Sequence, residues 1–119
     1  MSGFNFKDLV VWNLAMEYCE EVFKITEDLR SKIGNRRIID QLEDSSFSIH
    51  SNIAEGKGRY SDKEFVRFLI ISRGSLYESI SQLIFFNRQN LITDDVLNIM
   101  ENKGNTLAKK INSLINSIS

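Results

Sequence analysis

The sequence predicts an all-α protein, an antiparallel up-down-up-down bundle of four helices. Three observations predict it: apolar residues recur at spacings of three and four along four segments, short polar turns separate those segments, and the chain contains no proline. Four amphipathic helices with short links pack as an antiparallel bundle. Because 119 residues fit one domain, we expect residues 1–119 to form a single bundle.

The first helix is expected to begin at Asn5, whose side chain can cap it, and to end near residue 33. Gly34 and Asn35 follow, and both residue types favour a left-handed exit from a helix. The inward face is predicted to contain Leu9, Trp12, Met16, Cys19, Phe23 and Thr26.

The second helix, ended by Gly58, has small side chains among its inward positions. Small residues let a neighbouring helix approach, so we expect this helix to be the most closely packed one. The predicted inward positions are Leu42, Ser46, Ile49, Ile53 and Gly56.

The third helix is predicted to start at a capping box, in which Ser61 and Glu64 each satisfy a free backbone amide. Gly74, in the middle of this helix, is expected to mark a close approach by the second helix or by a neighbouring subunit. Apolar residues occupy more of this helix than three partner helices can cover, which predicts a homo-oligomer. One stripe is Phe65, Leu69, Ser72, Leu76, Ser79, Leu83 and Phe86, and beside it lie Val66, Ile70, Tyr77, Ile80 and Ile84.

The fourth helix is predicted to be capped by Thr93 and to continue to the end of the chain. Its heptad seam consists of Leu97, Met100, Gly104, Leu107, Ile111, Leu114 and Ile118.

Composition indicates a cytoplasmic protein without a membrane segment. The chain is 42% hydrophobic and 26% charged, its net charge is −1, and its apolar runs are far shorter than a bilayer span. Residues 1–4 do not open a signal peptide. The single cysteine, Cys19, is expected to be a reduced, buried thiol.

Ordered motifs run through the first three segments of the chain, from Phe6-Lys7-Asp8-Leu9 onward. On these motifs the chain resembles the four-helix-bundle proteins encoded in intervening sequences of bacterial 23S ribosomal RNA genes. The resemblance covers roughly residues 4–90. The motif residues of the second and third helices are Ser51, Asn52, Ile53, Ala54, Glu55, Gly56, Gly58, Arg59, Arg73, Gly74, Ser75 and Glu78.

The resemblance implies a homopentamer and a link to nucleic acid. Members of the family look like pentameric barrels, and their relatives include the accessory variability protein of diversity-generating retroelements, which binds nucleic acid and a reverse transcriptase. The partners it implies are therefore other copies of the chain, and RNA or a nucleic-acid-handling protein. Relatives tend to have proline before the second helix and basic residues after Gln41, where this chain has Glu43 and Asp44. Any RNA affinity is accordingly expected to be modest.

The sequence predicts neither an enzyme nor a metal or cofactor site. His50 and Cys19 are each the only residue of their type, so they cannot supply the four ligands of a zinc site. A di-iron bundle needs paired Glu-x-x-His motifs, and the residue three before His50 is Phe47. No Gly-x-Ser-x-Gly nucleophile turn occurs.

Residues 56–73 contain the one basic patch, with five basic and two acidic side chains, a net charge of +3. Either the patch contacts RNA phosphates, with nearby Tyr60, Phe65 and Phe68 stacking on bases, or it is a solvated hairpin. The candidate nucleic-acid contacts are Lys57, Arg59, Lys63 and Arg67.

Two functions are compatible with these residues. The first is a non-enzymatic homo-oligomeric scaffold or adaptor that binds RNA or a nucleic-acid enzyme. The alternative is a small-molecule-binding or catalytic bundle that uses a polar cluster of Asn52, Glu55 and Arg73. Helix levels predict Lys63 as the counter-ion of Glu55, and Arg73 as that of Asp44.

Overall fold

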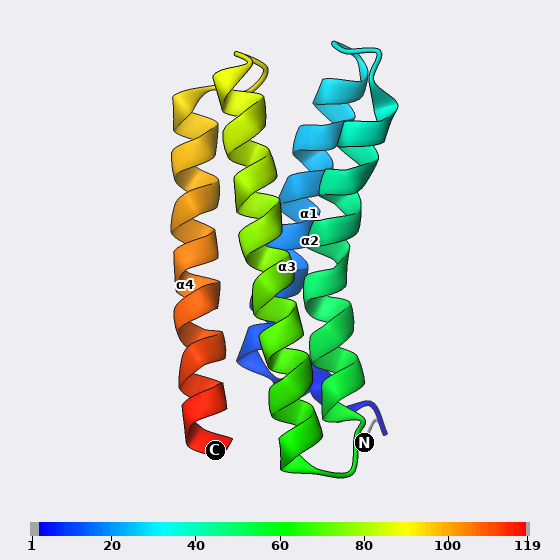
Figure 1. The fold of residues 1–119 in the computed structure, drawn as a ribbon, viewed down its shortest axis with the longest axis vertical. Coiled ribbons are helices and arrows are strands. Elements are labelled where there is room, and N and C mark those ends of the chain that lie inside the picture. Colours follow the sequence, from blue (N-terminus) through cyan, green and yellow to red (C-terminus); the bar gives the residue numbers. More distant parts are fainter. Residues whose placement is uncertain (1–2, 119) are drawn as a thin grey trace.

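Four long helices stand side by side in a rod of about 44 × 23 × 22 Å, and the chain reverses direction at each loop (Figure 1). This is a computed structural model, and it describes residues 3–118. The predicted all-α four-helix bundle is confirmed. Its elements are a short 3-10 helix η1 (Asn5–Asp8) and the helices α1 (Val10–Arg30), α2 (Arg36–Lys57), α3 (Asp62–Arg88) and α4 (Asp94–Ile118).

The predicted caps of α3 and α4 are confirmed. The Glu64 N–H donates to Ser61 Oγ over 3.1 Å, and the Val96 N–H donates to Thr93 Oγ1 over 3.2 Å. Each bond satisfies one of the amides that a helix start leaves without a partner. The reciprocal half of the capping box is not seen, because the Glu64 carboxylate accepts from Arg67 instead.

The chain's first helical segment differs from the prediction. Asn5 begins η1 rather than α1, and Leu9 is extended before α1 starts at Val10. The Asn13 amide holds this break by donating to the Lys7 and Leu9 carbonyls, each over 2.9 Å.

The end of α1 also differs from the prediction. The helix ends at Arg30, and the Ile33 N–H closes a turn on the Leu29 carbonyl over 3.0 Å. Gly34 does not take the expected left-handed conformation. Among residues 3–118, Asn90 takes it instead, with a φ of 61°.

The inward face of α1 is rotated from the predicted one. Cys19 and Thr26 are buried as expected, but Phe23 is exposed, and Tyr18 and Val22 are buried. Apolar residues lie on both flanks of this helix, so periodicity alone did not select the flank that faces the core.

The helices α2 and α3 pack closely, as predicted, and their inward stripes are buried as assigned. A Cβ placed on Gly56 would lie 2.6 Å from Phe68 Cβ. Between the same two helices, the Ser72 hydroxyl donates to the Ile49 carbonyl over 2.8 Å. Small inward residues therefore bring the two backbones together, as the sequence of α2 indicated.

A buried hydrogen bond also joins the diagonal pair α1 and α3. Tyr18 Oη lies 2.7 Å from Ser79 Oγ, and the Ser79 hydroxyl donates to the Leu76 carbonyl. Tyr18 is therefore the donor, because the serine has one proton to give. Burial raises the pKa of Tyr18 to about 12, so it stays protonated in this role.

Candidate functional site

The turn between α2 and α3 carries the predicted basic patch, and three of its four candidate nucleic-acid contacts lie over aromatic rings. Lys57 Nζ is 5.6 Å from the centre of the Phe65 ring. The Phe68 ring has the Arg59 guanidinium at 4.9 Å and that of Arg67 at 4.5 Å. Attraction between cations and ring faces favours these side-chain positions.

Carboxylates neutralise part of the same patch. Arg59 pairs with Glu55 over 2.7 Å, and Arg67 pairs with Glu64 over 2.8 Å. Hydrogen bonds from Arg67 lower the pKa of Glu64 below its ordinary value, so this carboxylate remains charged at neutral pH. Lys63 makes no cation–π contact and no ion pair with any described residue.

The expectation that Phe65 and Phe68 stack on bases is wrong. Both side chains are buried, and a Cβ on Gly56 would meet both of them. The missing side chain at position 56 leaves the space that these rings fill. Tyr60, in the turn, is fully exposed, and its role as a stacking platform stays a prediction.

The structure does not bring Asn52, Glu55 and Arg73 together into a polar cluster. The Asn52 amide donates to the Ser48 carbonyl within α2 over 2.8 Å. The Arg73 guanidinium donates to Asn112 Oδ1 on α4 over 2.6 Å.

The predicted counter-ions are therefore wrong. Glu55 pairs with Arg59 in the turn that follows its helix, and Arg73 donates to Asn112 on α4 rather than to Asp44. A residue four positions along the chain reaches a carboxylate at less conformational cost than one across the bundle.

The remaining motif residues divide between packing and the surface. Ile53 and Gly56 are buried in the core, and Gly58 caps the end of α2. The Ser51 hydroxyl donates to the Phe47 carbonyl over 3.0 Å. On the surface or partly buried are Ala54, Gly74, Ser75 and Glu78.

The outer side of α3 exposes several large apolar side chains. The exposed fractions are 45% for Ile70, 40% for Ile71, 64% for Tyr77 and 50% for Phe85. Gly74 lies among them, and a Cβ added there would have no atom within 4 Å. The expected approach of α2 to Gly74 is therefore wrong. We call these five residues the α3 face.

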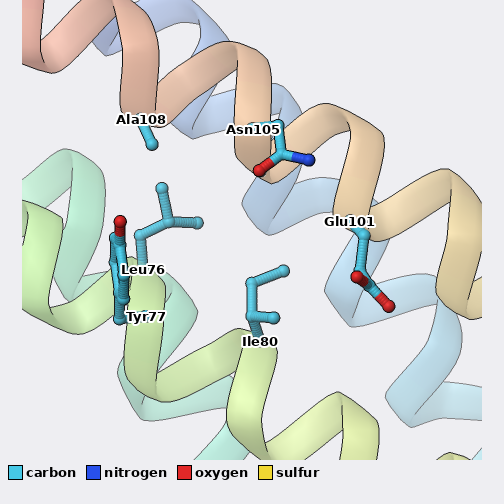
Figure 2. A pocket seen from close by; sticks show the side chains of 7 residues that line it. Leu76, Tyr77, Ile80, Glu101, Asn105 and Ala108 are labelled. Carbon is cyan, nitrogen blue, oxygen red and sulfur yellow. The ribbon is translucent and has the colours of Figure 1, made fainter.

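A hollow of about 160 Å³ lies beside this face, between α3 and α4 (Figure 2). Leu76 and Ile80 on α3 point toward it, and Ala108 does so from α4. Gly104 brings the helices together here, since its Cβ would lie 3.0 Å from Ile80 Cδ1. The heptad seam predicted the burial of Gly104 but did not indicate a hollow beside it.

His50 is buried in α2 with an unsatisfied nitrogen. Its side chain contacts the Phe47 ring edge to face, with 4.6 Å between the ring centres. Nε2 is buried and makes no hydrogen bond among the described residues. Burial lowers the pKa of His50, because a charged imidazolium is poorly solvated there.

His50 is expected to make the bundle less stable in acid. The unfolded chain binds a proton near pH 6.5, but the folded chain does so only at lower pH, so stability falls as pH drops below about 6.5. The slope is at most about 1.4 kcal/mol per pH unit for one proton. Urea unfolding of wild type and His50→Gln at pH 8 and pH 5.5 measures it. Equal losses in both proteins would show that His50 is not responsible.

Within residues 3–118, no cluster of three or more histidine, cysteine, aspartate or glutamate side chains is arranged to hold a metal ion. In the same range no helix offers an apolar stretch that would span a bilayer.

The sequence matches the family model described as 23S rRNA-intervening sequence protein over residues 7–113. The chain belongs to this family. The resemblance seen in the motifs is thus confirmed, and the match extends beyond them into α4. No curated protein matches the sequence.

A solved structure supports the fold of this 23S rRNA-intervening sequence family member. It is the crystal structure of a protein of unknown function from the S23 ribosomal protein family of Bacteroides thetaiotaomicron VPI-5482. The two structures superpose with a TM-score of 0.84 at 23% identity, over 89% of this chain and 98% of that one.

Proposed function

We propose that the protein is a non-enzymatic homo-oligomeric scaffold or adaptor. The observation that carries the proposal is the α3 face, where Ile70, Ile71 and Tyr77 lie within about one helical turn of a glycine with open space above it, and Phe85 lies about three turns further along the same side. Several large apolar side chains exposed on one side of a helix mark an interaction site. The absent side chain at Gly74 lets a second backbone approach without displacing any atom of this chain.

The assembly proposed is a homopentamer, as the family resemblance implies. Five chains of 13.7 kDa have a mass of about 68 kDa, and a stable contact buries roughly 1,000 Å² or more, so it persists on dilution. Light scattering at micromolar concentration is expected to give this mass. A mass near 14 kDa would contradict the scaffold.

The second part of the proposal is that the hairpin end of the assembly contacts RNA or a nucleic-acid-handling protein. In support, Lys57, Arg59 and Arg67 lie over aromatic rings, so part of their side-chain entropy is already lost before they bind a phosphate. The pairs with Glu55 and Glu64 reduce the charge, so each patch binds weakly. Repetition around a ring multiplies such contacts.

Removing a cation from this patch is expected to weaken RNA binding equally for every sequence. On single-stranded RNA the salt slope falls by about 0.7 for each phosphate that the protein no longer neutralises. Lys63→Gln is the cleanest variant, because Lys63 has no cation–π contact or ion pair within the described chain. Titrations start near 50 mM salt, with Lys109→Gln on the exposed surface of α4 as the control. If wild type shows no salt-dependent binding, the adaptor role must depend on a protein partner.

A further inference from the structure

We propose that the groove between α3 and α4 binds an amphipathic helix of a different protein. That helix carries an apolar side chain between a basic residue, which pairs with Glu101, and an acidic residue, which pairs with Arg73. The inference rests on the proposed adaptor function and names the site and chemistry of its partner.

The size of the hollow decides between a metabolite and a side chain. Sites for small molecules usually enclose about 300–1,000 Å³ and cover most of the ligand. This hollow has about 160 Å³, so it is too small for most metabolites. A cavity of about 150 Å³ holds a ring of six carbons, which is the size of one large apolar side chain.

The walls of the hollow suit such a side chain. Leu76 and Ile80 supply an apolar floor, and the small side chain of Ala108 leaves room for the guest side chain on the α4 side (Figure 2). The exposed ring of Tyr77 lies at the edge toward the α3 face. A helix lying along this groove would place one side chain in the hollow and its flanks against both helices, as in other helix-in-groove contacts.

Two opposite charges with no ion pair in the described part of this chain lie at the hollow and just beyond it, along the line where α3 and α4 meet. Glu101 lines the hollow at one end and pairs with no described cation. Outside the lining of the hollow, Arg73 on α3 donates to Asn112, one turn beyond Ala108 on α4, and it pairs with no described carboxylate. A guanidinium has five N–H donors, so Arg73 keeps donors for a carboxylate while it holds Asn112.

The spacing of these groups specifies the partner. Glu101 and Asn112 lie eleven residues apart on α4, which is about 16 Å. A helix running along α4 therefore needs its basic and acidic residues eleven positions apart. The apolar residue must lie level with Asn105, four positions from the basic residue and seven from the acidic one.

A second copy of the chain fits this pattern less well than a different protein does. Arg67, Ile71 and Glu78 have the required order, but at about 100° per residue they lie about 140° around α3 from Arg73. Matching them to the groove sets the two copies antiparallel. Two antiparallel copies form a closed dimer only when both use the same surface. Here the stripe of Arg67, Ile71 and Glu78 and the groove lie on different sides of the chain.

The test uses two fluorescein-labelled helical peptides of 21 residues, rich in alanine and glutamine. One contains Lys-x3-Leu-x6-Glu and the other the reverse order, Glu-x6-Leu-x3-Lys, because a helix can lie in either direction. Anisotropy with the full chain is expected to show saturable binding of one of them. Exchanging Lys and Glu in that peptide, or replacing its Leu by Gln, should weaken binding about tenfold.

The matched variant is Arg73→Glu with Glu101→Lys, which reverses both ends of the groove. It should bind the original peptide about tenfold more weakly, and the charge-exchanged peptide within about threefold of the wild-type pair. If losing the Asn112 bond unfolds this variant, Glu101→Lys alone tests the contact between Glu101 and the basic residue of the peptide. Ala108→Arg should block every peptide, and Lys109→Gln is the control that should change nothing.

Three results would overturn the proposal. The first is no saturable binding of either peptide, and the second is binding that charge reversal at Arg73 and Glu101 leaves unchanged. The third is a fall in the mass of the protein itself in Ala108→Arg, which would assign the groove to a second copy. Light scattering of the wild type separates these failures from failure of the scaffold, because an oligomeric mass can persist without peptide binding.

Discussion

Gly56→Ala is expected to lower the free energy of unfolding by about 3 kcal/mol. The new Cβ would lie 2.6 Å from Phe68 Cβ and 3.2 Å from Phe65 Cδ1. Phe68 Cβ is attached directly to the backbone of α3, so a side-chain rotation cannot relieve the overlap. The helices α2 and α3 must separate at the hairpin, which loosens the packing beneath the cations. Urea unfolding followed by circular dichroism measures the loss.

The control for this substitution is Gly34→Ala. Gly34 lies in the exposed loop between α1 and α2, has no atom within 4 Å of an added Cβ, and does not have a positive φ. Its replacement should change stability by less than about 0.5 kcal/mol. A similarly small change for Gly56→Ala would mean that the two helices do not meet as closely as described.

Gly74→Leu is expected to change the mass of the protein from that of an assembly to that of one chain. Within a single chain the leucine meets nothing, and it removes the cost of about 1 kcal/mol that a glycine imposes on a helix. In the assembly it would stand where the neighbouring backbone approaches. Light scattering should therefore give about 14 kDa, while circular dichroism still shows a folded helical bundle.

Lys109→Leu is the matched control, because it adds the same side chain at an exposed position of α4 outside the α3 face. It should leave the assembly intact. If Gly74→Leu also leaves the mass unchanged, the open space at Gly74 is not a contact between copies, and another surface must be sought.

The inward faces of α2 and α3 were predictable because small and large residues alternate on one stripe of each helix. Gly56 and Ser72 have no apolar bulk of their own, so their helical spacing alone placed them inside, and the structure places them there. The face of α1 was not predictable in this way. Phe23 and Val22 are both apolar and adjacent, and only the shape of the other three helices selects which one is buried.

The hairpin site was predictable as a set of residues but not as an arrangement. The positions of Lys57, Arg59 and Arg67 in the sequence indicated a basic patch, yet their contacts depend on two rings brought beneath them by Gly56. The α3–α4 groove gave no signal in the sequence. Ala108 reads as an ordinary helix residue, and its effect depends on which side of α4 faces Ile80.

The buried hydroxyls also determine which alternative packings the bundle avoids. Tyr18 reaches Ser79, and Ser72 reaches the Ile49 carbonyl, only at one axial position of α3 relative to its neighbours. Leucines and isoleucines would accept a slide of one helical turn with little penalty, because apolar contacts have no direction. Each hydroxyl left without a partner after such a slide would cost about 1–3 kcal/mol. Replacing Tyr18 and Ser79 together by Phe and Ala would thus keep the helices but allow α3 to occupy several axial positions. NMR spectra would then show more than one set of resonances.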